Sequence, residues 1–192
     1  MLKLYDEHGR ELDEADLYEA ANSCGLLLVT GITGSGYRVV AEALAHAAPR
    51  MREWDAVLNL KAVGLDLTSS LDPLATYFLG EFRPMAPGND QMLHVLTKVL
   101  ASGSQAVACT HALPVMRDGA RGGINCDGVL SRMGVKVMKG MDGAAARTRL
   151  VDLMVERGVK LVGVQRGEGV SRHVRCANLS ELVARDLPTA LR

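Results

Sequence analysis

The sequence has few aromatic residues, no excess of either charge and no long apolar run. Aromatic residues make up 4% of the 192-residue chain, and acidic and basic residues balance at 22 each. A chain without net charge has no overall field that would attract nucleic acid or an anionic membrane. No stretch approaches the roughly 18 apolar residues of a membrane-spanning helix, and the acidic N-terminus has no apolar signal segment. These absences predict a soluble, cytoplasmic protein with neither nucleic acid nor a membrane as partner.

The sequence also lacks the short motifs that bind metals or form local disulfides. The four cysteines, Cys24, Cys109, Cys126 and Cys176, are scattered without a C-x-x-C pair, and neither H-x-x-x-H nor H-E-x-x-H occurs. A chain of this size can bury a core without covalent cross-links. We therefore expect free thiols in a reducing compartment and no metal site, and the sequence identifies no cofactor.

Apolar runs of strand length alternate with helical stretches from Gly25 onward. The runs expected to be strands are Leu26–Thr30, Ala56–Leu67, Gln105–Cys109, Val135–Lys139 and Lys160–Gln165. The stretches expected to be helices are Tyr37–Ala48, Pro73–Phe82, Asp90–Ala101, Gly143–Glu156 and Leu179–Leu187. Short strands that are apolar on both faces and separated by helices form parallel sheets covered on both sides. The pattern predicts a three-layer α/β/α sandwich with a mostly parallel, doubly wound sheet, Rossmann-like or flavodoxin-like.

The first 24 residues form a separate pattern. A hairpin is expected around Glu7–Arg10, and Asp13 can cap a short helix that runs to Asn22 and ends at Gly25. We interpret residues 1–24 as an N-terminal appendage and residues 25–192 as a single α/β domain.

A glycine-rich turn follows the first predicted strand of that domain. Gly31 and Gly36 have the G-x-x-x-x-G spacing of a P-loop, but Tyr37 and Arg38 stand where lysine and a hydroxyl residue should follow. Without that lysine and the magnesium-binding hydroxyl, a P-loop phosphotransferase is not expected. The backbone N–H groups and the helix N-terminus could still bind an anion. The anion-binding residues predicted here are Gly31, Thr33, Gly34, Ser35, Gly36 and Arg38; the alternative is a turn that only lets the strand enter the helix.

The same segment resembles the T-G-x-x-G start of the extended short-chain dehydrogenases. Thr30, Gly31 and Gly34 match that start, whereas Tyr37 stands where the family keeps its last glycine. No Tyr-x-x-x-Lys pair occurs in the chain to supply the family's catalytic residues, so this activity is not expected.

A cysteine and a histidine lie at the tip of another predicted strand. Cys109 and His111 would reach the carboxyl edge of the sheet, where an imidazolium could stabilise a thiolate, and we take them as candidate catalytic residues. The stretch Cys109-Thr-His, with Leu-Pro shortly after it, resembles the second cysteine motif of the aspartate/glutamate racemases, which implies a catalytic thiol at Cys109. The architecture is also similar to that of sulfur-relay proteins of the DsrE type. The alternative is a buried, unreactive cysteine in a core strand.

Basic residues follow several of the predicted strands. Arg117, Arg121 and Arg166, with Arg38, would gather on the carboxyl edge and favour an anionic ligand. Our main hypothesis is therefore an enzyme-type domain that binds a phosphorylated or carboxylated small molecule at this edge. The alternatives are a cysteine-based protein that uses Cys109 and a non-catalytic interaction or regulatory module.

The segment Pro73–Phe82 also suggests an oligomer. As a helix it would be apolar around most of its circumference, so it would need cover on two sides. A second subunit could supply that cover, and we expect a homodimer; the alternative is cover by residues 1–24.

Overall fold

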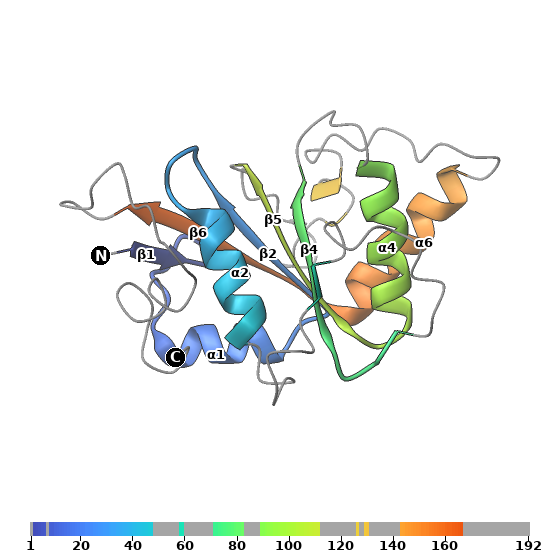
Figure 1. Ribbon diagram of the computed structural model, residues 1–192, viewed down its shortest axis with the longest axis horizontal. Helices are drawn as coiled ribbons and strands as arrows, with labels where there is room; N and C mark the ends of the chain where they lie inside the picture. The colour runs from blue at the N-terminus through green and yellow to red at the C-terminus, as the bar shows by residue number, and fades with distance from the viewer. Residues whose placement is uncertain are drawn as a thin grey trace.

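The computed structural model describes residues 2–6, 8–47, 58–59, 71–82, 89–111, 126, 129–130 and 143–166 (Figure 1). Its strands are β1 (Leu2–Tyr5), β2 (Leu26–Gly31), β3 (Leu58–Asn59), β4 (Thr76–Phe82), β5 (Gln105–His111) and β6 (Val159–Arg166). Its helices are α1 (Glu14–Asn22), α2 (Tyr37–Ala47), α4 (Asn89–Ala101) and α6 (Gly143–Arg157). None of these described helices is long and apolar enough to cross a membrane.

The strands form one six-stranded sheet in the order β1-β6-β2-β5-β4-β3. All the pairings are parallel except that of β1 with β6. In both the Rossmann and the flavodoxin orders, the first parallel strand pairs with the second. Here β2, the first of the parallel strands described, pairs instead with the last two, β5 and β6.

Helices cover both faces of the sheet, as Figure 1 shows. Helices α1 and α2 lie over one face, where Leu17, Val40 and Leu44 join Val29 and Val107 in one core cluster. Helices α4 and α6 lie over the other face and form a second cluster with alternate residues of the same strands. The predicted α/β sandwich with a mostly parallel, doubly wound sheet is therefore confirmed.

One predicted helix is wrong, because Pro73–Phe82 contains the strand β4. All seven residues of β4 are buried, since β4 lies between β5 and β3 and under helices on both faces. A strand buried on both faces is apolar on every side, and periodicity alone does not distinguish it from a buried helix. Tyr77 and Phe78 favour the strand, because aromatic residues are common in sheets.

This correction removes the basis for the expected homodimer. The apolar side chains of β4 are covered within one chain, so no second subunit is needed to bury them. Phe78, one of these side chains, is 3% exposed in the core. The homodimer stays a prediction that this segment no longer supports.

Most other elements agree with the sequence pattern to within one or two residues, as α2, α4, β2, β5 and β6 show. Of the predicted strand Ala56–Leu67, only β3 is described. The predicted strand Val135–Lys139 and the predicted helix Leu179–Leu187 lie outside the described residues.

Residues 2–25 contribute an edge strand and a helix to this architecture. Strand β1 pairs with β6 on one side. On its other side lies the chain that returns from the following turn, and there the Leu12 N–H donates to the Leu4 carbonyl at 2.7 Å. Helix α1 begins with the predicted cap: Asp13 and Asp16 each accept from the other's backbone N–H. The end of α1 is tied to the sheet by Gln105, whose buried amide donates to the carbonyls of Ala21 and Cys24.

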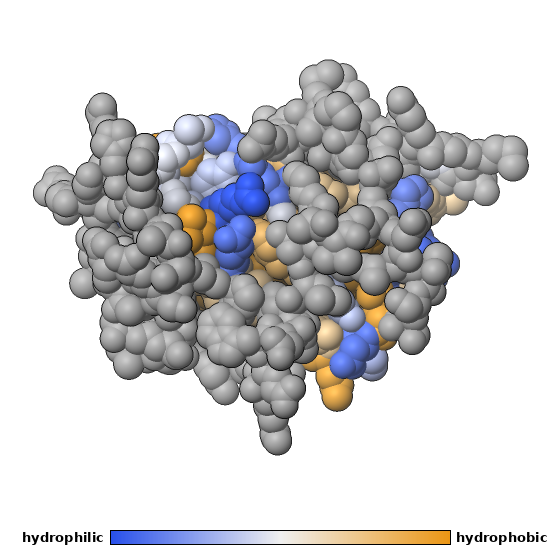
Figure 2. Space-filling model, viewed as in Figure 1, coloured by the Kyte–Doolittle hydropathy of each residue, from blue (hydrophilic) through white to orange (hydrophobic). Residues whose placement is uncertain are grey.

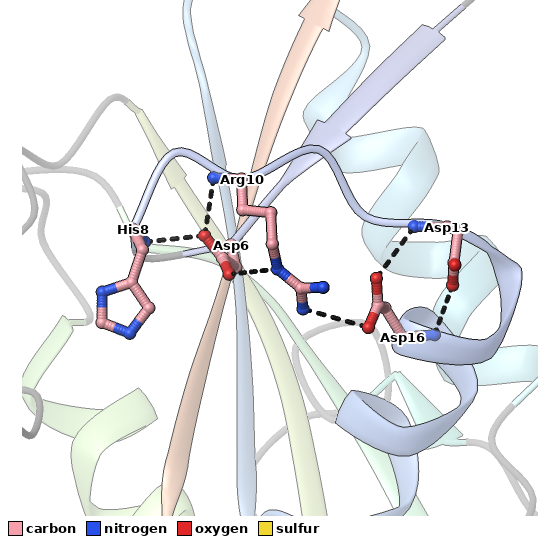
Figure 3. Close-up of polar contacts among 5 residues, drawn as sticks. All are labelled: Asp6, His8, Arg10, Asp13 and Asp16. Atoms are coloured by element: carbon pink, nitrogen blue, oxygen red, sulfur yellow. Dashed lines mark hydrogen bonds and ion pairs between the residues drawn. The ribbon is translucent and has the colours of Figure 1, made fainter.

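A polar network closes the turn between β1 and α1 (Figure 3). The Asp6 carboxylate accepts from the backbone N–H groups of His8 and Arg10, each at 2.8 Å, and the Arg10 guanidinium bridges Asp6 and Asp16. Partial burial acts to raise the pKa of Asp6, but these donors together outweigh it and hold that pKa below its ordinary value.

The Asp6 carboxylate should therefore stabilise the fold in a pH-dependent way. A depressed folded-state pKa contributes stability above the unfolded pKa of about 3.9, and this is lost as the pH falls through the folded value. We expect Asp6→Asn, which keeps an acceptor oxygen, to lower the free energy of unfolding by about 1 kcal/mol at neutral pH. In urea titrations this difference from the wild type should shrink below pH 4, whereas the exposed control Asp152→Asn should show little difference at any pH. A difference that grew at acid pH would contradict this assignment.

Candidate functional site

The sheet has a topological switch point between β2 and β5. The chain leaves β2 for α2 on one face, whereas it returns from β5 to β6 through α6 on the other face. Neighbouring strands whose connections go to opposite faces mark the place where open α/β sheets bind ligands, outside the carboxyl ends of the strands, and β2 and β5 are such a pair. Gly31 and His111, the last residues of the two strands, are paired at this point.

The loop of residues 31–36 lies on one side of this switch point. Gly34 and Gly36 have φ values of 85° and 86°, which glycine adopts without strain. A Cβ on Gly31 would overlap the Ser35 hydroxyl oxygen and lie 2.9 Å from Tyr37 Cβ. Glycine at these positions therefore lets the chain fold back tightly from β2 into α2.

Helix α2 begins without a side-chain cap from its N-cap residue. The Gly36 carbonyl accepts the first helical hydrogen bond, from the Val40 N–H at 3.1 Å, which makes Gly36 the N-cap. Glycine has no side chain to accept from the first turn, in contrast to Asp13 at the start of α1. The positive end of the α2 dipole thus faces the loop without a capping side chain at that position.

The Ser35 hydroxyl is the unusual polar group of this loop. Ser35 is 2% exposed, and its Oγ has no hydrogen-bond partner among the described residues. The hydroxyl lies against Gly31, inside the fold of the loop. Leaving a buried hydroxyl without a partner costs about 1–3 kcal/mol. The Ser35 hydroxyl therefore destabilises the fold unless a further group forms a hydrogen bond with it. On the outer side of the loop Ile32, Thr33 and Gly34 are exposed, and Figure 2 shows a mainly hydrophilic described surface over α2 and this loop.

Removing the Ser35 hydroxyl should therefore stabilise the ligand-free protein. We expect Ser35→Ala to raise the free energy of unfolding by about 1 kcal/mol. Ser104 provides a matched control, because it is equally buried but its hydroxyl donates to the Asp72 carbonyl at 2.7 Å. Ser104→Ala should lower the free energy of unfolding by about 1 kcal/mol in the same urea titrations. Equal losses in the two variants would mean that Ser35 has a structural partner.

A tyrosine and a glutamate join α2 to the sheet beside the loop. The Tyr37 hydroxyl donates to Glu81 Oε1 at 2.6 Å, and Glu81 is 9% exposed near the carboxyl end of β4. The contact crosses β5, because Tyr37 follows β2 and Glu81 pairs with Cys109. The sequence analysis missed this pair, since it placed Glu81 in a helix. The sequence did contain a sign of this pair, because Glu81 is a single carboxylate in the otherwise apolar run Thr76–Phe82.

Of the four basic residues predicted to gather at this edge, the structure describes two, Arg38 and Arg166. The Arg38 guanidinium lies along α2, 3.3 Å from the Glu42 carboxylate, and its side chain is 53% exposed. An exposed pair of this kind contributes little energy, so it does not hold Arg38 away from a ligand. Arg166 is the last residue of β6 and pairs with Leu2 of β1. Arg117 and Arg121 lie outside the described residues.

The two candidate catalytic residues differ in burial. His111 is exposed at the end of β5, whereas Cys109 is 0% exposed in the core between the sheet and α2. The Cys109 thiol lies 3.7 Å from the Gly80 carbonyl oxygen. This is the environment of the core cysteine that the sequence left as the alternative. Cys24 and Cys126 are also buried and form no disulfide.

Cys109 should therefore be protected from thiol reagents in the native protein. We expect the wild type and a Cys109→Ala variant to release equal amounts of chromophore from an aromatic disulfide reagent under native conditions. In denaturant the wild type should release one equivalent more, because the buried thiol becomes accessible. One additional equivalent in the native wild type would restore Cys109 as a reactive group.

Two other features carry no site. The described residues contain no group of three or more metal-binding side chains. A small pocket between the N-terminal turn, α1 and β6 is lined by Asp6, Arg10 and Asp16, whose charged groups already bind one another.

Comparison with protein-family models, with curated proteins and with solved structures found no significant match for this chain. Its function must therefore be inferred from the geometry of the carboxyl edge.

Proposed function

We propose that this α/β domain binds an anionic small molecule, phosphorylated or carboxylated, at the loop of residues 31–36, as the binding step of an enzyme. The observation that carries the proposal is the Ser35 hydroxyl, buried and without a partner, beside the N-terminus of α2 at the switch point of the sheet. A ligand oxygen could accept from this hydroxyl and from the backbone N–H groups of the first turn.

The energies involved suit a weakly held anionic group. A charge at a helix N-terminus gains about 0.3–1 kcal/mol, and each hydrogen bond to a charged group contributes about 1.5–3 kcal/mol. Two or three such bonds support a dissociation constant for free phosphate on the order of 1 mM, and a substrate would add contacts from the rest of the molecule.

No described contact favours the cysteine-based alternative, because Cys109 lies in the core and not on the ligand edge. A catalytic role for His111 and ligand-binding roles for the arginines after the strands stay part of the proposal. His111 is the described candidate, since it is exposed and paired with the first residue of the loop.

Inorganic phosphate is the simplest probe of this proposal. In a titration followed by amide chemical shifts, we expect phosphate to perturb residues 34–37 first. Gly34→Ala should weaken the affinity at least about tenfold, because alanine at a φ of 85° costs about 1–2 kcal/mol and reorients the loop. Ser35→Ala should weaken it about tenfold by removing a donor.

Gly9→Ala is the matched control for Gly34→Ala. Gly9 has a φ of 78° and open space around an added Cβ, as Gly34 has, but it lies in the N-terminal turn. Both variants should lose similar stability, and Gly9→Ala should bind phosphate like the wild type. If phosphate left the amides of residues 34–37 unchanged, or if both glycine variants bound equally well, the loop would be only a structural turn.

A further inference from the structure

The proposed anion site depends on how the first turn of α2 is oriented toward the loop of residues 31–36. Resting on the proposed function, we infer that Tyr37 is a positioning residue of this site. Its hydrogen bond to Glu81 fixes the start of α2 against the sheet, so that the Ser35 hydroxyl and the N–H groups of the first turn face one ligand. The ligand is an oxyanion such as phosphate, and the bond raises its affinity by holding the binding groups in place before it arrives.

Tyr37 lies next to the groups that would bind the anion. It is the first residue of α2 and directly follows Gly36, the N-cap residue. A Cβ on Gly31 would overlap the Ser35 hydroxyl oxygen and lie 2.9 Å from Tyr37 Cβ, so these two side chains approach the end of β2 at one point. A movement of Tyr37 therefore moves the first turn of α2 relative to the end of β2 and to the Ser35 hydroxyl.

The Tyr37 side chain reaches from β2 across β5 to β4. Its Cβ lies beside Gly31 at the end of β2. Its hydroxyl donates to Glu81 Oε1 of β4 at 2.6 Å, and β5 lies between these two strands. The ring packs against the core cluster that contains Cys109. A hydroxyl that donates to a carboxylate forms a bond of about 2.5–2.7 Å, about twice as strong as one between neutral groups. The contact thus anchors the start of the helix to a buried strand.

Glycines on both sides of Ser35 give this anchor its importance. Gly34 and Gly36 both have positive φ values, and glycine has more backbone conformations available than other residues. Gly36 also has no side chain that could cap the first turn. Binding an anion requires these residues to adopt one conformation, which has an entropic cost. Because the Tyr37–Glu81 bond fixes the residue that follows them, part of that cost is removed before the ligand binds.

Two tyrosines allow a matched test of this inference in the full chain. Tyr37→Phe removes only the hydroxyl that binds Glu81 and keeps the ring in the core. Tyr77→Phe is the control, because the Tyr77 hydroxyl accepts from the Asp72 N–H at 2.9 Å but lies at the opposite end of β4. Both variants should lower the urea midpoint of unfolding. Tyr37→Phe should weaken the affinity for inorganic phosphate about three- to tenfold, the equivalent of one hydrogen bond, whereas Tyr77→Phe should bind phosphate like the wild type.

A second pair of variants tests the other side of the bond. Glu81→Gln keeps an oxygen that can accept from Tyr37, and Glu81→Leu does not. Both are neutral, so any effect of the lost carboxylate charge on phosphate is the same in the two. We expect Glu81→Gln to have about threefold or more the phosphate affinity of Glu81→Leu. In a Tyr37→Phe background the two should bind equally, because the hydroxyl that distinguishes them is absent.

The outcomes separate this inference from the proposed function. If Tyr37→Phe lost stability but bound phosphate like the wild type, or if Glu81→Gln and Glu81→Leu bound it equally, Tyr37 would be only a structural residue and the loop would remain an anion site. If the wild type bound no phosphate, the proposed function itself would fail, and this inference with it. Either pair of variants decides the inference where a member of the other does not fold.

Discussion

The central strands β2, β5 and β4 are buried on both faces, and the rest of the architecture follows from the need to cover them. A parallel sheet of this kind is stable only between two layers of helices. Helices α1 and α2 supply one layer, and α4 and α6 supply the other. Because successive crossovers are right-handed, covering both faces requires the chain to reverse its direction across the sheet. The switch point between β2 and β5 is the result of that reversal.

The candidate site lies where this packing leaves polar groups incompletely satisfied. Most buried polar side chains in the described residues are bound within the fold, as Gln105 is to the end of α1 and Thr110 to the Phe82 carbonyl. The loop of residues 31–36 differs, because close packing against Gly31 buries the Ser35 hydroxyl without a partner. Gly36, the N-cap residue of α2, has no side chain that could cap the helix. These features stabilise the free protein little, but they suit an oxyanion.

The strengths of the sequence prediction can be traced to particular residues. The loop was found because glycines at fixed spacing between an apolar run and an amphipathic helix have a local physical meaning. The α1 cap was found for the same reason, at Asp13. Cys109 shows the limit of such reasoning, since a strand-end position does not reveal that α2 covers the thiol. The Tyr37–Glu81 pair joins residues 44 positions apart, and no local pattern connects them.

The sequence by itself determined the class of the fold, the ends of most helices and strands and the place of the glycine loop. These depend on backbone preferences and on the alternation of apolar and polar residues, which act over a few neighbours along the chain. Only the tertiary structure decided that Thr76–Phe82 is a strand, that β1 pairs with β6 and that Glu81 lies beside the α2 N-terminus. A segment that is apolar on every side is compatible with a buried helix or a buried strand. The choice is made by the strands that it pairs with, and those are distant in the sequence.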